Sequence, residues 1–221
     1  PWVYLSYAEP GSGAEAGLAG TAVARGRLQG NALVGTQVIF RQAPKVGGSG
    51  HFGSRLVFSR DKTLLVTLGE RQKGEPAQEL SSHLGKVVRI RRDGSLPPDN
   101  PVLPAGAAPG LWSWGHRNAQ GAALHPRTGE LWLSEHGPQG GDEINIARAG
   151  KNYGWPLRSQ GCPYGSTVGD ACRIGGGVHA PEFVEPLTTW TPVSIAPSGL
   201  AFYTGAMFPE WQGSLFAGAL A

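Results

Sequence analysis

The segment Lys86-Val87-Val88-Arg89-Ile90-Arg91, followed by Asp93-Gly94, has the clearest strand pattern in the sequence. Val88 and Ile90 alternate with Arg89 and Arg91, and this period of two places side chains on opposite faces of a β-strand. Asp-Gly is a pair that favours a tight turn, because glycine adopts left-handed backbone angles without a steric cost. The segment therefore predicts a β-strand that ends in a turn.

Similar apolar runs, bounded by Gly, Pro or Asn, recur along the chain and predict further strands. They cover residues 2–8, 21–28, 32–40, 55–58, 64–68, 121–125, 130–134, 200–203 and 215–220. Residues 59–62 and 126–129 are hairpin loops in this interpretation. Helical patterns are limited to short candidates at 14–18 and 78–83. The sequence predicts an all-β protein, and strand–turn–strand units about every 40–50 residues favour propeller blades over a sandwich or barrel.

Length and composition are those of one globular domain, residues 1–221. The 35 glycines and 18 prolines approach a low-complexity composition. However, 40% of the residues are hydrophobic and seven are tryptophan, so the chain can bury a core and the Gly and Pro residues belong to turns. Because the sequence starts at Pro1 and ends within an apolar run, we expect an incomplete domain whose first and last blades are missing or partial.

Charge and cysteine content indicate which binding partners and which cellular compartment to expect. The 19 Lys and Arg residues, with a net charge of +3, are spread along the chain, which indicates a solvated surface and no nucleic-acid partner. No apolar run reaches the roughly 18 residues of a transmembrane segment. Cys162 and Cys172 share a Gly- and Pro-rich loop and suggest a local disulfide in an oxidising compartment, with free thiols as the alternative.

Two polar clusters interrupt the strand pattern with residues suited to catalysis or binding. In the first, His51 lies between glycines at a strand entrance, where its imidazole could accept a proton; a turn or core histidine is the alternative. In the second, Arg117 and Asn118 offer a guanidinium and an amide to a ligand rich in carbonyl and carboxylate oxygens. The alternative for this pair is a structural salt bridge beneath the neighbouring tryptophans.

A third cluster covers residues 134–145 and is followed by residues 151–156. Its acidic side chains and Gly-rich loop offer an oxygen-only ligand set, which suits Ca²⁺ better than zinc or copper. The regular acidic spacing of an EF-hand is absent. A plain polar turn is the alternative.

Six segments, taken in order, resemble the soluble PQQ-dependent aldose sugar dehydrogenases, the relatives of soluble glucose dehydrogenase. They are His51-Phe52-Gly53-Ser54-Arg55-Leu56, Leu68-Gly69-Glu70-Arg71, Gly115-His116-Arg117-Asn118, Ser134-Glu135-His136-Gly137-Pro138 with Gly141-Asp142-Glu143-Ile144-Asn145, Asn152-Tyr153-Gly154-Trp155-Pro156, and Ala196-Pro197-Ser198-Gly199. The resemblance implies a six-bladed β-propeller, of which this chain supplies about four blades. It also implies a quinoprotein oxidoreductase that oxidises the anomeric C1 hydroxyl of an aldose to a lactone by hydride transfer to calcium-bound pyrroloquinoline quinone (PQQ).

The resemblance further implies a role for particular residues. It assigns His51 as the general base and Arg117 as the residue that stabilises charge on the quinone. The implied PQQ contacts are Arg117, Asn118 and Tyr164. The Gly137 and Pro138 carbonyls are the implied ligands of the calcium that holds PQQ, and Glu143 with the Tyr153 carbonyl forms a further calcium site. Some relatives have an acidic residue immediately before the base, where this chain has Gly50. The group that orients His51 must therefore come from elsewhere in the chain.

The implied partners are an aldose substrate and an external electron acceptor, in a periplasmic or secreted protein that is a monomer or homodimer. Two alternatives stay open. One is a cofactor-free propeller that binds a carbohydrate or protein, and the other is a hydrolase, such as a lactonase, on a related calcium propeller. The pairing of His51 with Arg117 and Asn118 favours the dehydrogenase.

Overall fold

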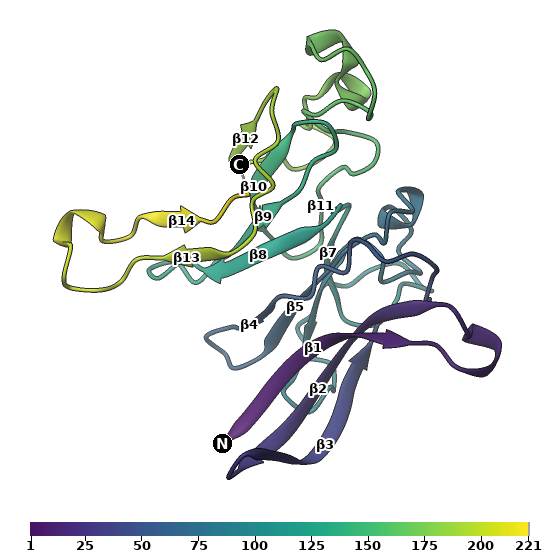
Figure 1. The fold of residues 1–221 in the computed structure, drawn as a ribbon, viewed down its shortest axis with the longest axis vertical. Helices are drawn as coiled ribbons and strands as arrows, with labels where there is room; N and C mark the ends of the chain where they lie inside the picture. The colour runs from purple at the N-terminus through teal and green to yellow at the C-terminus, as the bar shows by residue number, and fades with distance from the viewer. Residues whose placement is uncertain (221) are drawn as a thin grey trace.

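The computed structural model describes residues 1–220, which form four sheets that follow one another along the chain (Figure 1). The expectation of an all-β protein is confirmed. Within these residues there is no α-helix, and helical structure is limited to single 3₁₀ turns. These turns are η1 (Gly13–Glu15), η2 (Glu75–Ala77), η3 (Asp170–Cys172), η4 (Ile174–Gly176) and η5 (Pro209–Trp211).

Each sheet is assembled mainly from strands that are consecutive in sequence. The first sheet has the order β1 (Trp2–Pro10), β2 (Ala19–Gln29), β3 (Ala32–Arg41). The second has the order β11 (Lys151–Asn152), β7 (Leu111–Trp114), β6 (Lys86–Ile90), β5 (Leu64–Leu68), β4 (Leu56–Phe58). The third has the order β12 (Thr188–Trp190), β10 (Asp142–Ala147), β9 (Leu131–Glu135), β8 (Ala119–Leu124). The fourth pairs β13 (Leu200–Phe202) with β14 (Leu215–Ala217).

Strand pairing follows the pattern of propeller blades. All the pairs are antiparallel except the two-residue pairing of β11 with β7, which is parallel. A propeller blade is a small meander of this kind, and successive blades pack face to face. The four sheets correspond to about four blades of the six-bladed β-propeller.

The core lies between successive sheets, and strand β5 contributes to both sides of it. Its five residues are all buried, as expected for a strand covered on both faces. Leu64 and Val66 pack with Val23 of the first sheet. Leu65, on the opposite face, packs with Leu133 of the third sheet. Alternate side chains of one strand thus hold three sheets together.

Strand β6, which has the clearest alternation in the sequence, is also buried on both faces. Arg89 lies between sheets, and its guanidinium forms ion pairs with Asp61 at 2.5 Å and Asp99 at 3.1 Å. Lys86 is fully buried and donates to three backbone carbonyls of the preceding loop. Burial lowers the pKa of Lys86 to about 7. Lys86 and Arg89, which lie on opposite faces of this strand, are therefore both internal and paired.

Two expectations about local structure are wrong. The helix candidates at residues 14–18 and 78–83 form turns, with a single 3₁₀ turn overlapping the first and preceding the second. Residues 142–145, interpreted as part of a polar loop, belong to strand β10. The sequence pattern misses this strand because Asp142, Glu143 and Asn145 are buried polar residues. A buried polar strand lacks the hydrophobic alternation by which strands are recognised.

The register of the strands brings the polar clusters together at one end of the second and third sheets. Leu68 pairs with Lys86, which pairs with Trp114. In the third sheet, Glu135 pairs with both Ala119 and Glu143. The second and third clusters lie in loops at these strand ends, and the His51 cluster precedes β4, whose first residue pairs with Val66 near the end of β5.

Cys162 and Cys172 form a disulfide, as the sequence suggested. The bond closes the loop that follows β11. Within residues 1–220, no helix has the length and apolar character needed to cross a membrane.

Candidate active site

The His51 loop has a tightly constrained backbone. His51 has φ = 54°, in the left-handed region that non-glycine residues seldom occupy. A Cβ on Gly69 would lie 2.1 Å from the His51 carbonyl oxygen, so only glycine allows the two segments to approach this closely. The buried Arg71 guanidinium lies 3.5 Å from the centre of the Phe52 ring and donates to three backbone carbonyls around the loop. The loop around His51 is therefore fixed before any ligand binds.

Glu70 orients the His51 ring. The Nδ1 atom of His51 lies 2.5 Å from Oε1 of Glu70, whose side chain is only 2% exposed. Burial raises the pKa of Glu70, but the hydrogen bonds from His51 and from the Gly74 amide outweigh burial and hold the pKa below its usual value. An ionised carboxylate can only accept a hydrogen bond, so Nδ1 of His51 carries a proton. The other ring nitrogen, Nε2, is then the atom available to accept a proton from a substrate.

Arg117 lies after strand β7, and both its backbone amide and its backbone carbonyl are hydrogen-bonded. Its amide donates to Glu135, and its carbonyl accepts from the Glu70 amide at 2.9 Å. Its guanidinium donates to the His136 carbonyl and to the Tyr164 hydroxyl, each at 3.1 Å. The Glu70 contact links this residue directly to the His51 loop.

Asn118 also connects the segment after β7 to the His51 loop, through its side chain. Its Oδ1 atom accepts a hydrogen bond from the Gly53 amide at 3.1 Å, and its backbone carbonyl accepts from the His136 amide at 3.3 Å. Asn118 is nearly fully buried. His51, Arg117 and Asn118 therefore belong to one connected cluster, although they are separated by more than 60 residues in the sequence.

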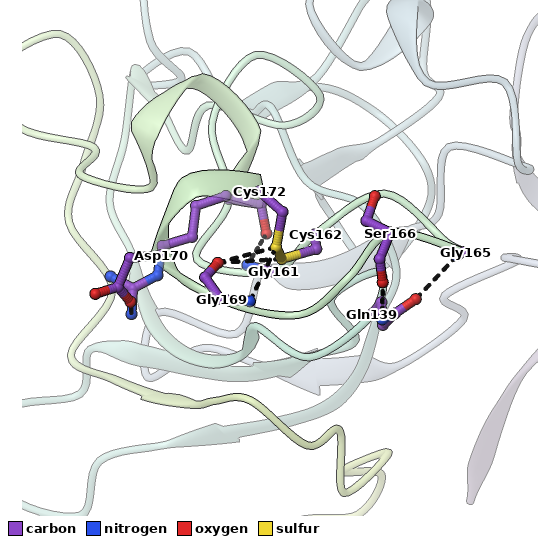
Figure 2. The surroundings of a disulfide bond; sticks show 10 residues. Gln139, Gly161, Cys162, Gly165, Ser166, Gly169, Asp170 and Cys172 are labelled. Atoms are coloured by element: carbon purple, nitrogen blue, oxygen red, sulfur yellow. Dashed lines mark hydrogen bonds and ion pairs between the residues drawn. A yellow bond between two sulfur atoms is a disulfide. The ribbon is translucent and has the colours of Figure 1, made fainter.

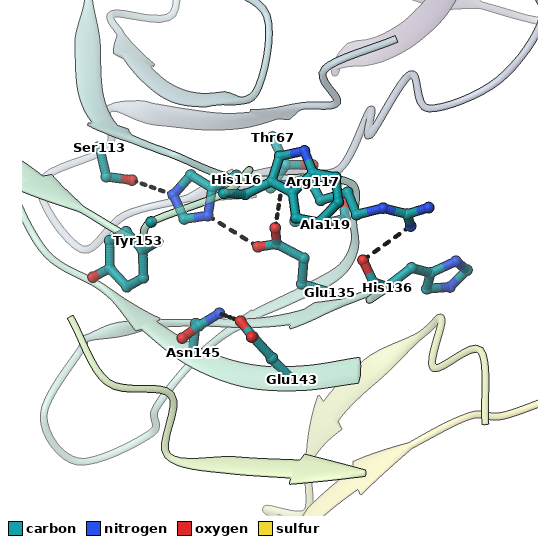
Figure 3. A network of polar contacts seen from close by, with 12 residues as sticks. Thr67, Ser113, His116, Arg117, Ala119, Glu135, His136, Glu143, Asn145 and Tyr153 are labelled. Carbon is teal, nitrogen blue, oxygen red and sulfur yellow. Dashed lines mark hydrogen bonds and ion pairs between the residues drawn. The ribbon is translucent and has the colours of Figure 1, made fainter. Parts of the chain in front are cut away.

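A small cavity of about 10 Å³ opens beside Arg117, a volume close to that of one water molecule or ion. Its lining comes from four neighbouring loops and strand ends, several of which appear in Figure 3. The lining residues are Gly115, Arg117, Glu135, His136, Gly137, Gly141, Glu143, Tyr153, Trp155, Arg158, Ser159 and His179. The cavity unites the second and third sequence clusters.

The lining contains polar atoms without partners. Six buried side-chain polar atoms in residues 1–220 lack a hydrogen bond, and three of them belong to this lining. They are Nε of Arg117, Nε1 of Trp155 and Nδ1 of His179. Because a buried polar atom is costly to leave unpaired, such a concentration indicates a binding site for a polar group.

The oxygen atoms around the cavity suit a calcium ion. Among the described residues, none donates a hydrogen bond to the carbonyl oxygens of Gly137, Pro138 or Tyr153. No group of three or more His, Cys, Asp or Glu side chains in residues 1–220 could hold a metal, so a cation here would need such carbonyls. Carbonyl and carboxylate oxygens are typical calcium ligands.

Glu143 adds a carboxyl group to this oxygen set. Burial, reinforced by the neighbouring Glu135 carboxylate, raises the pKa of Glu143 to about 8. Its Oε2 atom accepts from Asn145 at 2.9 Å, and its Oε1 atom lies 3.7 Å from Nε2 of His179. A bound cation would favour the ionised form of this carboxyl group. The donor set therefore fits the calcium implied by the sequence.

The loop that carries Gly137 is shaped by the buried Asp142 side chain. Its Oδ1 atom accepts from the Gly137 amide at 2.8 Å, and its Oδ2 atom accepts from Ser194 and from the amides of Ile195 and Ala196. The Gly137 amide is engaged in this contact, whereas no donor among the described residues bonds the Gly137 carbonyl. Asp142 thus links the candidate calcium loop to the segment before β13.

Tyr164 is held over Arg117 by the disulfide-closed loop. Figure 2 shows the Gln139 side chain bonded to this loop, at 2.9 Å from both the Ser166 carbonyl and the Gly165 amide. The backbones of Gln139 and Cys162 also exchange two hydrogen bonds of 3.0 Å. Tyr164 is 72% exposed, with its hydroxyl on Arg117 and its ring centre 5.9 Å from the guanidinium carbon. Tyr164 is therefore mostly exposed while its hydroxyl stays in contact with Arg117.

The structure brings most of the predicted site residues into one region. Arg117, Gly137, Glu143 and Tyr153 line the cavity, Pro138 follows Gly137, and Asn118, His51 and Tyr164 connect to it through the contacts described above. Sequence reasoning assigned no role to Glu70, Glu135 and His179. Glu70 and Glu135 occur within the motifs quoted for the family resemblance, whereas no pattern in the sequence distinguishes His179.

Comparison with known proteins is consistent with this geometry. Residues 1–221 match the family described as glucose/sorbosone dehydrogenase. An aldose sugar dehydrogenase of Escherichia coli (strain K12) is 45% identical over 223 residues, which cover 99% of this chain and 58% of the relative.

Two solved structures are similar over nearly the whole chain. A crystal structure of a glucose dehydrogenase has a TM-score of 0.90 and 49% identity, covering 99% of this chain and 62% of that protein. The PQQ-bound form of an aldose sugar dehydrogenase from Streptomyces coelicolor has a TM-score of 0.72 and 29% identity, covering 99% and 55%. The chain thus spans little more than half the length of these relatives.

Proposed function

The chain belongs to the glucose/sorbosone dehydrogenase family, and we propose that the protein containing it oxidises the anomeric carbon of aldose sugars to lactones, with PQQ and calcium as cofactors. The observation that carries the proposal is the His51–Glu70 pair connected to Arg117, whose buried Nε atom has no partner within residues 1–220. In this proposal residues 1–221 form part of one propeller domain. The PQQ-bound relative supports the choice of cofactor.

Proton transfer from the sugar is the step assigned to His51. Its Nε2 atom accepts the proton of the anomeric hydroxyl, while Nδ1 keeps its own proton in the hydrogen bond to Glu70. The imidazolium that forms is stabilised by the Glu70 carboxylate, just as a buried acid stabilises the histidine of a catalytic triad. The pair therefore orients the base and stabilises its charged form.

Arg117, Asn118 and Tyr164 form the proposed PQQ contacts. The Arg117 guanidinium presents a fixed positive charge to a carboxylate or quinone oxygen, and the exposed Tyr164 ring offers a flat surface for a planar cofactor. The Gly137 and Pro138 carbonyls would hold the calcium that contacts PQQ, and Glu143 with the Tyr153 carbonyl would hold a second ion. When bound, PQQ supplies the acceptor for the hydride that leaves C1, and calcium supplies Lewis acidity beside it.

The disulfide supports a periplasmic or secreted location, since such bonds persist in oxidising compartments. An external electron acceptor would then reoxidise the cofactor.

Equilibrium binding of PQQ to the full-length protein that contains this chain tests the proposal. Fluorescence titration of the metal-stripped protein should show PQQ binding with added Ca²⁺ and much weaker binding with a chelator. Absence of PQQ binding at any calcium concentration would reject the proposal in favour of a cofactor-free propeller that binds a carbohydrate or protein.

Replacing Glu70 with glutamine should lower turnover by about 10²-fold, because a neutral amide cannot accept from both His51 and the Gly74 amide as the carboxylate oxygens do, and it lacks the charge that stabilises the protonated His51 ring. The substrate KM should change much less. Steady-state kinetics of Glu70→Gln, beside the exposed Glu75→Gln on the same loop, measures the effect. Equal turnover in the two variants would remove Glu70 from the mechanism.

The same variant has a pH signature in stability. Because the pKa of Glu70 is lower in the folded chain than in the unfolded chain, the ionised group stabilises the fold above its unfolded pKa, about 4.3. This contribution is lost as the pH falls through the folded pKa. The difference in unfolding free energy between wild type and Glu70→Gln should therefore shrink below about pH 4 in urea titrations.

A further inference from the structure

Three buried polar side chains, Ser113, His116 and Glu135, form a hydrogen-bonded chain that ends at the backbone amide of Arg117. Figure 3 shows His116 between Ser113 and Glu135, with Glu135 also bonded to the Arg117 backbone. The Ser113 hydroxyl lies 2.8 Å from Nε2 of His116, and Nδ1 of His116 lies 2.9 Å from Oε2 of Glu135. All three side chains are almost completely buried. The Ser113 hydroxyl, which would be the nucleophile of a hydrolytic triad, is fully buried and has no access to substrate, so this order of residue types is no hydrolytic triad.

The Glu135 carboxylate serves two donors at once. Oε2 accepts from Nδ1 of His116, and Oε1 accepts from the amide of Arg117. The His116 ring is itself fixed by stacking on Tyr153, with ring centres 4.6 Å apart. One carboxylate oxygen of Glu135 is therefore bonded to the buried His116, and the other oxygen is bonded to the backbone amide of Arg117.

The Glu135 contact holds the amide side of the Arg117 backbone. The Arg117 carbonyl is held by the Glu70 amide, but within the described chain the Arg117 amide has Glu135 as its partner. The peptide groups on either side of the residue set the direction in which its side chain leaves the backbone. That side chain crosses the cavity to the His136 carbonyl and to Tyr164, so a small rotation of the backbone would displace the guanidinium.

We propose that Glu135 is a positioning residue for PQQ binding: its carboxylate couples the Arg117 amide to the buried His116 and thereby aims the Arg117 guanidinium at the cofactor. Glu135 acts through Arg117. The inference rests on the proposed function, because it takes PQQ as the ligand of Arg117.

A double-mutant cycle on the full-length protein tests the coupling. PQQ dissociation constants are measured by fluorescence titration at saturating Ca²⁺ for wild type, Glu135→Gln, Arg117→Ala and the double variant. Glu135→Gln should raise the dissociation constant roughly tenfold, since the amide cannot accept from both donors. In the Arg117→Ala background the same change should add less than about twofold, because the residue through which Glu135 acts is gone.

A second readout needs no cofactor. Hydrogen exchange at the Arg117 amide should be faster in Glu135→Gln than in wild type, because the amide loses its charged acceptor. The matched control is Glu9→Gln in β1, which removes a carboxylate that also pairs with two donors, the side chains of Arg41 and Lys45. This control should leave both Arg117 exchange and PQQ affinity unchanged. Glu135→Asp keeps the negative charge on a shorter side chain and should show a smaller effect. It replaces Glu135→Gln in both measurements if Glu135→Gln does not fold.

The outcomes separate the two proposals. The positioning role would be overturned if Glu135→Gln and Arg117→Ala had additive effects on PQQ affinity. It would also be overturned if Glu135→Gln changed neither PQQ affinity nor hydrogen exchange at the Arg117 amide. In both cases PQQ binding by wild type would leave the proposed function standing. Failure of wild type to bind PQQ would overturn both.

Discussion

Replacing His51 with alanine should lower the turnover of the reconstituted enzyme by roughly 10²–10⁴-fold, the range for loss of a general acid–base group. The structure supports an effect of this size because the ring is fixed by Glu70 at 2.5 Å and its loop is braced by Arg71 and Gly69. PQQ affinity should change little, since His51 lies outside the set of proposed cofactor contacts. Single-turnover kinetics with saturating sugar would isolate the chemical step.

Two further variants keep this prediction interpretable. His51→Gln retains an N–H group for the buried Glu70 carboxylate but lacks a basic nitrogen, so its turnover should fall as far as that of His51→Ala while its stability stays closer to wild type. His125→Ala is the matched control, because His125 lies in the β8–β9 turn at the opposite end of the strands from Glu135. Near-normal turnover in His51→Ala would exclude His51 as the base.

Replacing Arg117 with alanine should lower turnover by roughly 10²–10³-fold, the cost of removing one preorganised group that stabilises developing charge. Unlike the His51 variants, Arg117→Ala should also weaken PQQ binding, since the guanidinium is a proposed contact in the bound state as well. Comparing the PQQ dissociation constant with turnover at saturating PQQ separates these two effects.

Arg117→Lys provides a test of geometry at constant charge. A lysine keeps the positive charge but lacks the planar fork that reaches both the His136 carbonyl and Tyr164, so an intermediate turnover is expected. The control is Arg173→Ala, which removes an arginine that pairs with the exposed Asp170 on the disulfide-closed loop. Wild-type turnover and PQQ affinity in Arg117→Ala would contradict the proposed role.

The strands of the first sheet, and β4, β5 and β6 of the second, could be predicted because their sequence carries the physical cause of their structure. β5, for example, is a continuous apolar run that packs against both neighbouring sheets. β10 could not be predicted this way, since its polar residues are buried: Asp142 bonds the distant Ser194 segment, Glu143 faces the cavity, and Asn145 donates to Glu143. Local patterns report hydrophobic burial and contain no information about such long-range polar contacts.

The same distinction applies to the site. The motifs around His51 and Arg117 are visible as local clusters, whereas the partner of His51 lies 19 residues further along the chain. The absence of an acidic residue at position 50 predicted that this partner comes from elsewhere, and the structure identifies it as Glu70. His179 enters the cavity from a loop without any sequence signal, because its role depends only on how that loop folds over β10.

The measurement that tests the central claim most directly is dye-linked sugar oxidation by the full-length protein that contains this chain. The protein is reconstituted with PQQ and Ca²⁺, an aldose and an artificial electron acceptor are added, and dye reduction is followed with and without PQQ and with and without a chelator during reconstitution. The proposed function predicts aldose-dependent dye reduction that requires both PQQ and calcium and produces the lactone. Dye reduction that is independent of PQQ, or no reduction across a broad panel of aldoses by protein with bound PQQ, would contradict it.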